Sequence, residues 1–285
     1  MRFVGEKVLS PVVASGKAVR PDRGRPSAQR VTLDAALRTA VALLVLPAAL
    51  CLASVWALLL VLVGAPQTWI DRAYTGFARF ALWVGATRTE IRGLEYLEPG
   101  QAYVVVPNHE SSWDPVVLFA ALSQLRLRAV VKEEAARIPV FGHALLLTGN
   151  VRVERTHTAA DVQRIRTAMA ARPSDVSMLF YAEGTRSRDG AFHAFKKGAF
   201  VTAIAYGLPI LPVATAGTRR LWPPLTVRMR SGPVVVEIGR PIQVAGLTLA
   251  DRDRLRDETY GTVRALREAA RRRLRALGVE PGGID

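Results

Sequence analysis

The sequence predicts an α/β fold: a single domain built on a mixed or largely parallel sheet, preceded by an N-terminal membrane-associated helical segment. Two observations indicate it. Residues 40–65 form a nearly continuous apolar run. From Gly93 onward, short apolar runs of β-type alternate with stretches of helical periodicity, a pattern typical of a sheet covered by helices. Half of the 285 residues are hydrophobic, which is enough for the core of one large domain.

The apolar run is the first element, and its composition favours a bilayer. No charged residue lies between Arg38 and Asp71. A single helix over residues 40–65 would extend about 39 Å, longer than the roughly 30 Å of bilayer hydrocarbon. The run also exceeds the apolar core of a cleaved signal peptide, which is about 7–15 residues long. We therefore expect the segment to be retained, with residues 1–38 forming a basic, disordered leader.

A second, interfacial helix is expected directly after the apolar run. Gly64 and Pro66 mark a stop. An apolar stripe then recurs at helical spacing, formed by Trp69, Ile70, Ala73, Phe77, Phe80, Ala81 and Val84. Such a stripe suits a helix at headgroup level. Both flanks of the run are positively charged, so the positive-inside rule places both at the cytoplasmic side. Residues 39–84 are therefore expected to attach from one face of the membrane, in preference to a single span.

The remaining residues, 85–285, are expected to form the α/β domain. Apolar runs predict strands at residues 103–106, 128–131, 151–153, 176–180, 210–214 and 234–238. Helical periodicity predicts helices at 115–125, 133–146, 159–171, 194–206 and 251–277. The last helix is amphipathic, basic and Arg-rich at its end. Two interpretations of that end remain open: a solvated face that stabilises the helix terminus, or contact with anionic headgroups.

The charge balance narrows the classes of partner. Lys and Arg number 39 against 24 Asp and Glu, a net charge of +15. Such a chain seeks anionic partners: nucleic acid, anionic membrane lipids or phosphorylated small molecules. No nucleic-acid-binding motif is present, so we predict no nucleic-acid partner. The single cysteine, Cys51, excludes an intramolecular disulfide and a thiolate-rich zinc site.

The first chemistry-bearing stretch begins where the strand at 103–106 ends. His109 lies just past that strand and Asp114 five residues later, at a strand-to-helix corner where sites of α/β proteins collect. An Asp that accepts one imidazole N–H leaves the other ring nitrogen as a base. The spacing alone also suits a histidine that only caps or packs. No G-x-S-x-G elbow surrounds Ser111 or Ser112, and the four histidines do not cluster, so neither a serine nucleophile nor a metal is predicted.

A second stretch has the composition of a phosphate site. The strand at 176–180 leads into Glu183, Gly184, Thr185, Arg186 and Ser187. A glycine that exposes backbone N–H groups, a hydroxyl and an Arg fork are means of holding a phosphate. Lys132 and Arg155 end two other predicted strands, so several cations are expected at one edge of the sheet. An ordinary polar turn is the alternative interpretation.

Together these stretches resemble the glycerolipid acyltransferase family, of the 1-acylglycerol-3-phosphate acyltransferase type, whose four blocks appear here in order. The N-H-x-x-x-x-D block is matched by Asn108, His109 and Asp114, and the K-P-G-G-R block by Lys132, Pro139, Gly142, Gly149 and Arg155. The E-G-T-R-S block is matched by residues 183–187, and the P-I-x-P-V block by Pro209, Ile210, Pro212 and Val213. The chain departs from the family at Ala182, where proline is usual, and at Val151 or Arg152, where an aromatic residue is usual.

The resemblance implies a reaction and a set of roles. His109, oriented by Asp114, takes the proton from the hydroxyl of a lysophospholipid as that oxygen attacks an acyl thioester. The groups implied to hold the acceptor are Arg186, Thr185, Gly184, Arg155, Lys132 and Glu183, with Glu183 orienting the Arg or a glycerol hydroxyl. Asn108, Ser187, Pro209 and Pro212 support the motifs. The donor is acyl-CoA or acyl carrier protein, with no further cofactor and no metal.

The implied product is phosphatidic acid, formed at the cytoplasmic face of the cell membrane. Three alternatives remain open at this point. The chain could act on another lyso-acceptor, such as a lyso-ornithine lipid or a different lysophospholipid. It could be a transacylase that uses a phospholipid as donor. It could also be a non-catalytic lipid-binding protein, in which His109 and Asp114 are incidental.

Overall fold

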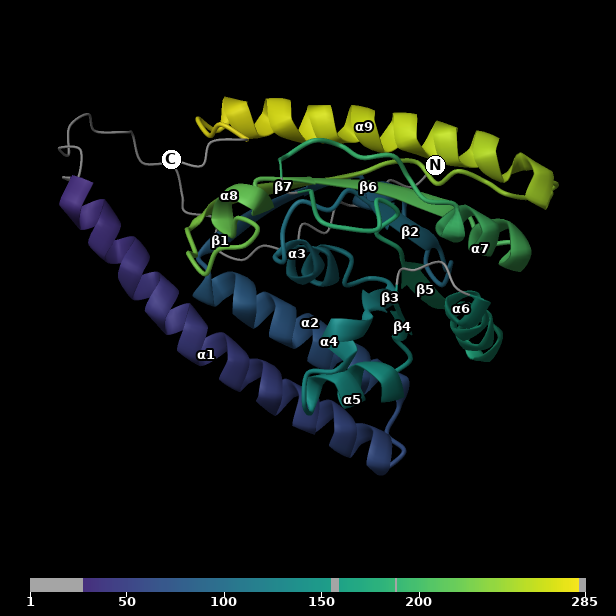
Figure 1. Ribbon diagram of the computed structural model, residues 1–285, viewed down its shortest axis with the longest axis horizontal. Coiled ribbons are helices and arrows are strands. Elements are labelled where there is room, and N and C mark those ends of the chain that lie inside the picture. Colours follow the sequence, from purple (N-terminus) through teal and green to yellow (C-terminus); the bar gives the residue numbers. More distant parts are fainter. Residues whose placement is uncertain (1–27, 155–158, 188, 282–285) are drawn as a thin grey trace, which may run out of the picture.

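A seven-stranded sheet forms the centre of the molecule (Figure 1). The computed structural model describes residues 28–154, 159–187 and 189–281. The strands are β1 (Thr87–Arg92), β2 (Val104–Pro107), β3 (Arg126–Lys132), β4 (Val151–Val153), β5 (Val176–Leu179), β6 (Ile210–Ala216) and β7 (Gly232–Ile238). They lie in the order β1–β7–β6–β2–β5–β3–β4, and each neighbouring pair is parallel except β6 and β7. This confirms the expected mixed sheet.

Strand β2 lies inside the sheet and determines where the site forms. All of its residues are buried, with Val104 and Val106 in one core and Val105 in the other. β5 and β6 flank β2 in parallel, with Val105 opposite Leu179 and Leu211. The carboxyl ends of these three strands therefore meet at one edge, the place where open parallel sheets form their sites.

Strand β1 corrects the expectation that the first strand lies at residues 103–106. Its sequence is TRTEIR, in which Ile91 is the single large apolar side chain. β1 pairs with β7 alone, from Thr87 opposite Gly232 to Arg92 opposite Glu237, so it is an edge strand. Short polar edge strands lack the hydrophobic alternation by which strands are recognised in a sequence.

Helices cover both faces of the sheet (Figure 1). One face carries α1 (Ala28–Leu62), α2 (Gln67–Val84), α3 (Asp114–Ala121), α4 (Glu133–Ala136) and α5 (Phe141–Leu147). The other carries α6 (Ala159–Ala171), α7 (Gly198–Tyr206) and α9 (Arg252–Ala276). The short helix α8 (Thr218–Leu221) follows β6, and single turns of 3₁₀ helix lie at Leu94–Tyr96 and Leu249–Asp251.

The helix expected at 133–146 is two helices, α4 and α5. The chain between them contains Pro139, which cannot donate a backbone hydrogen bond, and Val140, whose φ is 64°. A positive φ is rare for a β-branched residue. Gly142 then lies so close to Ala136 that a Cβ would come within 1.9 Å of the Ala136 carbonyl oxygen. The sharp turn therefore depends on both Pro139 and Gly142.

The N-terminal helices form a hairpin along the domain. α1 passes through Pro47 without a break and begins at Ala28, inside the stretch expected to be a leader; residues 1–27 lie outside the described ones. Residues Thr39–Leu62 are long and apolar enough to cross a membrane. α2 then runs back between α1 and the sheet (Figure 1). The α/β domain therefore flanks α1 along its side and does not hang from its end.

The apolar stripe of α2 is divided between two environments. Ile70 and Ala81 are buried and Phe77 packs against the core, whereas Trp69 and Phe80 are exposed. Large exposed apolar side chains continue around this region on Leu44, Leu52, Trp56, Leu59, Leu62, Trp83, Ile138, Leu147, Leu225 and Val227. We call these residues, with Trp69 and Phe80, the apolar surface. Exposed patches of this kind mark interaction sites.

Helix α9 lies across the opposite face of the sheet (Figure 1). Its buried side chains include Leu255, Val263 and Leu274. Three of its arginines face carboxylates of the domain, since Arg267 and Arg271 contact Glu110 and Arg273 lies 3.3 Å from Glu237. The sheet therefore separates the Arg-rich helix from the apolar surface.

Candidate active site

The loop after β2 is fastened to the neighbouring strand β6. The Asn108 side chain donates from Nδ2 to the Thr215 carbonyl at 3.0 Å and accepts the Thr215 N–H at Oδ1 at 2.8 Å. An amide side chain that pairs with both backbone groups of one residue acts as an additional rung of the sheet. Asn108 thereby fixes where the next residue, His109, leaves the strand.

His109 and Asp114 form a buried pair. The His109 Nδ1 lies 2.9 Å from Asp114 Oδ2, and their side chains are 9% and 0% exposed. The same Oδ2 accepts the backbone N–H groups of Glu110 at 2.7 Å and Ser111 at 2.8 Å. These donors hold the carboxylate in one orientation. With the Nδ1 proton donated to Asp114, the His109 Nε2 carries the lone pair of a base.

Tyr181 packs against the His109 ring. The ring centroids are 3.8 Å apart with an interplanar angle of 22°, so the phenol fixes the plane of the imidazole. The Tyr181 hydroxyl is buried and has no hydrogen-bond partner among the described residues. Burial raises the pKa of this phenol well above its usual value. Tyr181 therefore stays neutral beside the histidine.

Glu183 joins the two loops of the site. Its Oε1 accepts the His109 N–H at 2.8 Å and its Oε2 accepts the His193 N–H at 3.1 Å. The side chain is buried, and burial raises the pKa of this carboxyl to about 7. Both oxygens are engaged by backbone donors, and the described residues include no hydrogen bond from Glu183 to Arg186. The geometry thus makes Glu183 a link between the two loops. Its expected role in orienting Arg186 or a glycerol hydroxyl stays a prediction.

A large apolar cavity opens beside His109. It has a volume of about 1150 Å³. Its walls come mainly from α1, α2, α3 and α5, including Leu46, Leu50, Phe77, Phe119 and Leu145. His109, Ser112, Lys132, Gly184, Thr185 and Arg186 line the same cavity, and Glu134 and Asn150 are among its further polar side chains. The basic nitrogen of the pair thus lies where an apolar chamber meets a polar rim.

The cations expected at the sheet edge have different environments. Arg186 is exposed, and its Nη1 donates to the Ser112 hydroxyl. Lys132 is exposed at the end of β3 and pairs with Glu134. Arg155 lies outside the described residues. The structure therefore brings Arg186, from the loop after β5, and Lys132, from the end of β3, to one cavity.

The remaining motif residues are structural. The Ser187 N–H donates to the His109 carbonyl at 2.8 Å, a second tie between the two loops. The carbonyl of Pro209 accepts the Val104 N–H at 3.0 Å, and that of Pro212 accepts the Gly239 N–H at 2.8 Å. Gly184 has a φ of +77°, which a glycine adopts without strain. Among the described residues, no three His, Cys, Asp or Glu side chains gather in a group that could hold a metal.

The fold and these motifs coincide with a known domain. The family model described as Acyltransferase matches residues 88–216, a range that contains both His109 and Arg186. Residues 88–216 of the chain belong to the acyltransferase family.

Named relatives share this acyltransferase domain. The chain is 30% identical over 169 residues to a 1-acyl-sn-glycerol-3-phosphate acyltransferase of Limnanthes douglasii. It is 31% identical over 171 residues to 1-acyl-sn-glycerol-3-phosphate acyltransferase alpha of Homo sapiens, and 31% over 179 residues to the 1-acyl-sn-glycerol-3-phosphate acyltransferase of Pseudomonas aeruginosa. These matches cover 59–60% of this chain and 59%, 60% and 66% of the three relatives. The chain thus spans about three fifths of the length of its relatives.

A solved structure has the same fold as this chain. The 1-acyl-sn-glycerophosphate acyltransferase from Thermotoga maritima matches with a TM-score of 0.70 at 21% identity. The match covers 82% of this chain and 97% of that chain. The α/β fold expected from the sequence is thereby confirmed.

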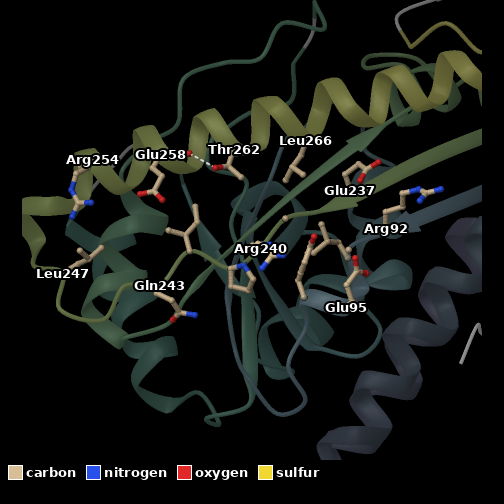
Figure 2. Close-up of a pocket in the computed structure, with 16 residues that line it drawn as sticks. Arg92, Glu95, Glu237, Arg240, Gln243, Leu247, Arg254, Glu258, Thr262 and Leu266 are labelled. Carbon is tan, nitrogen blue, oxygen red and sulfur yellow. Dashed lines mark hydrogen bonds between the residues drawn. The ribbon is translucent and has the colours of Figure 1, made fainter. Parts of the chain in front are cut away.

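A second hollow lies at the opposite edge of the sheet (Figure 2). β7 runs against β6, so its carboxyl end is remote from the His109 edge. The hollow measures about 920 Å³ and holds three arginines and three glutamates, Arg92, Arg240, Arg254, Glu95, Glu237 and Glu258. Balanced charge gives no preference for an anion. Among the described residues, the cavity beside His109 differs from this hollow, because it combines mainly apolar walls with the cations Arg186 and Lys132.

Several site residues were not identified from the sequence. Tyr181 lies just before the third block, and its position two residues before Glu183 is the signal that could have identified it. Thr215 pairs with Asn108, and Arg267 contacts Glu110 at a separation of 157 residues. No local pattern marks contacts of this length. Those residues required the tertiary structure.

Proposed function

We propose that the chain is a membrane-associated 1-acylglycerol-3-phosphate acyltransferase. It moves a fatty acyl group from an acyl thioester to the free hydroxyl of 1-acylglycerol-3-phosphate and forms phosphatidic acid. The observation that carries the proposal is the buried His109–Asp114 pair at the polar rim of an apolar cavity, 2.9 Å between Nδ1 and Oδ2, beside Arg186.

The transfer proceeds directly, without an acyl-enzyme. The Nε2 of His109 takes the proton from the acceptor hydroxyl while its oxygen attacks the thioester carbonyl carbon. The C–S bond then breaks, and the leaving sulfur takes the proton from the imidazolium. Asp114 stabilises the imidazolium through Nδ1. The two backbone donors on Asp114 keep its carboxylate in place throughout.

The acceptor's phosphate binds at the cationic rim. Arg186 offers a guanidinium fork, which suits phosphate oxygens, and Thr185 and the Gly184 backbone lie beside it. Lys132, on the same cavity, adds a second charge, and Arg155 is expected to add a third. The acyl donor is acyl-CoA or acyl carrier protein, and the proposal includes no resident cofactor and no metal.

The acyl chains occupy the apolar cavity and the bilayer next to it. The walls contributed by α1 are apolar side chains such as Leu46 and Leu50. The apolar surface surrounds the same helices, so it would lie in the membrane. Because α2 and α5 flank α1, a bilayer crossed by α1 at right angles would have to enclose them as well. If the chain attaches from one face of the membrane, the cytoplasmic one, α2 and α5 need not be enclosed by the bilayer.

The test of the proposed reaction is a product assay. The purified full chain in detergent is incubated with a panel of lysolipids and either acyl-CoA or acyl carrier protein, and the diacyl product is identified by its mass. We expect diacylglycerol phosphate. If a product forms only from another lysolipid, that lysolipid is the acceptor and the proposed one is wrong. If no lysolipid in the panel gives a product, the chain is better explained as a non-catalytic lipid-binding protein.

The general base is tested by His109→Ala, with His143→Ala as the matched control because His143 is exposed on α5. General-base catalysis contributes about 10²–10⁴-fold, so turnover should fall by that factor in the first variant and stay unchanged in the second. A His109→Ala protein that keeps more than about a tenth of the turnover would contradict the role.

The phosphate site is tested by Arg186→Ala. A charge-assisted hydrogen bond contributes about 1.5–3 kcal/mol, so the acceptor KM should rise by roughly 10- to 100-fold. Arg240→Ala is the control, since Arg240 lies in the hollow at the opposite edge. Equal effects of the two substitutions on KM would place the phosphate elsewhere.

A further inference from the structure

Two consecutive residues of the first motif, His109 and Glu110, have side chains on opposite sides of the sheet. His109 lines the apolar cavity formed with α1 and α2. Glu110 contacts α9, where its Oε1 accepts a hydrogen bond from Arg267 Nε at 2.6 Å. The Glu110 and Arg267 side chains are 3% and 5% exposed. A buried ion pair therefore begins at the residue next to the proposed base.

The same guanidinium also contacts the loop that carries Arg186. Arg267 Nη2 donates to the Gly190 carbonyl at 2.6 Å, and its guanidinium lies 5.7 Å from the centre of the Phe192 ring. Arg271 reaches the same two acceptors at longer range, 3.5 Å to Glu110 and 3.4 Å to Gly190. Arg267 thus connects the loops after β2 and β5 through short hydrogen bonds, and Arg271 adds longer contacts to the same two loops.

The chemistry of this connection requires an arginine. Burial raises the pKa of Glu110, and the positive charge of Arg267 opposes that rise. The planar fork donates to a carboxylate and a carbonyl in fixed directions, which an ammonium cannot reproduce. A buried ion pair can usually be replaced by apolar residues without loss of stability. A contact that served stability alone would therefore tolerate removal of both charges.

We propose that Arg267 is a positioning residue for the transfer reaction. It acts through Glu110 on His109 and through Gly190 on the loop of Arg186, and it sets the distance between base and phosphate site. The kinetic form of this inference rests on the proposed function. A misplacement of about 1 Å at a reacting group costs up to about 100-fold in rate.

The kinetic test compares Arg267→Met, Arg267→Lys and the double variant Glu110→Gln/Arg267→Met. Arg264→Met is the control, because Arg264 is exposed on the same helix. We expect Arg267→Met to lower both the melting temperature and kcat, with kcat reduced roughly 10- to 100-fold and the acceptor KM nearly unchanged. Arg267→Lys keeps the charge without the fork, so its kcat should stay low.

The double variant separates positioning from stability. Removal of both charges leaves no unpaired buried carboxylate, so the melting temperature should recover while kcat stays at the level of Arg267→Met. Recovery of kcat together with the melting temperature would overturn the inference. So would a kcat of Arg267→Met equal to that of Arg264→Met.

A readout without turnover distinguishes this inference from the proposed function. The ring-nitrogen resonances of ¹⁵N-labelled histidine, at one pH, report the surroundings of His109, with His143 as internal reference. Arg267→Met should shift the His109 signals and Arg264→Met should not. If no lysolipid is acylated but the shift occurs, the proposed function fails and the positional link stands. If acylation occurs and the signals do not shift, the link fails and the function stands.

Discussion

The two faces of the sheet differ in how many large apolar side chains they leave exposed. The face that carries α1 and α2 leaves large apolar side chains exposed, among them Leu44 at 75% and Trp83 at 76%, and encloses an open cavity. We call the face that carries α9 the closed one, because Leu255, Val263 and Leu274 are buried there and Arg267 is paired with Glu110. The hollow at its edge is lined by balanced charges. In our proposal, lipid covers the exposed apolar side chains of the first face, whereas the protein itself covers those of the second.

The boundary between the two faces runs through the first motif. Successive residues of an extended segment point to opposite sides, so His109 belongs to the open face and Glu110 to the closed one. This division explains how a reactive group can lie beside an open cavity and still be held in place. In our proposal, the contacts that hold His109 come from the α9 side of the sheet, and the substrate binds on the other side.

The largest expected difference between the faces is in stability. Leu274 on α9 is 0% exposed and Leu52 on α1 is 71% exposed, so Leu274→Ala and Leu52→Ala remove the same atoms from opposite environments. We expect the first to lower the free energy of unfolding by about 2–5 kcal/mol and the second to change it by less than about 0.5 kcal/mol. Denaturant unfolding of the full chain in detergent measures both. Equal losses would mean that the open face is packed as tightly as the closed one.

A pH dependence should come from Glu183, the link between the two loops. Its pKa rises from 4.5 to about 7 on folding, so the folded state holds this proton more tightly. Its stabilising contribution is present below the unfolded pKa and is lost as pH rises through about 7. Between pH 4.5 and about 7, the free energy of unfolding of the wild type should therefore fall by roughly 3 kcal/mol relative to that of Glu183→Gln. A difference in unfolding free energy between the two proteins that is constant with pH would contradict the buried, proton-binding Glu183.

The smallest effect is expected at Tyr181, on the open face. Its hydroxyl is buried without a partner among the described residues, and an unpaired buried polar group costs about 1–3 kcal/mol. Tyr181→Phe keeps the ring that stacks on His109 and should raise the free energy of unfolding by about 1 kcal/mol with kcat unchanged. A loss of stability would show that the hydroxyl has a partner in solution, such as a water molecule.

Much of the fold follows from local patterns. The strands at 151–153 and 176–180 and the helix at 159–171 lie where their periodicity places them, to within a residue. The polar edge strand β1 and the break at Pro139 were not predicted. In the first case an edge strand has no apolar alternation to detect, and in the second a positive φ at Val140 depends on the close approach of Gly142 to Ala136.

In the candidate site, too, some features follow from local sequence and others depend on distant contacts. His109 and Asp114 lie five residues apart at one strand-to-helix corner, so their pairing needs little more than that corner. The spacing alone left a capping or packing histidine open, and the four motifs together favoured the pair. Tyr181 and Glu183 come from the end of β5, and Arg267 comes from a helix 157 residues beyond Glu110. Which arginine among the 39 basic residues becomes buried beside Glu110 depends on how α9 crosses the sheet. Only the tertiary structure decides this, because the free energy of a buried charge is determined by neighbours that are distant in the chain.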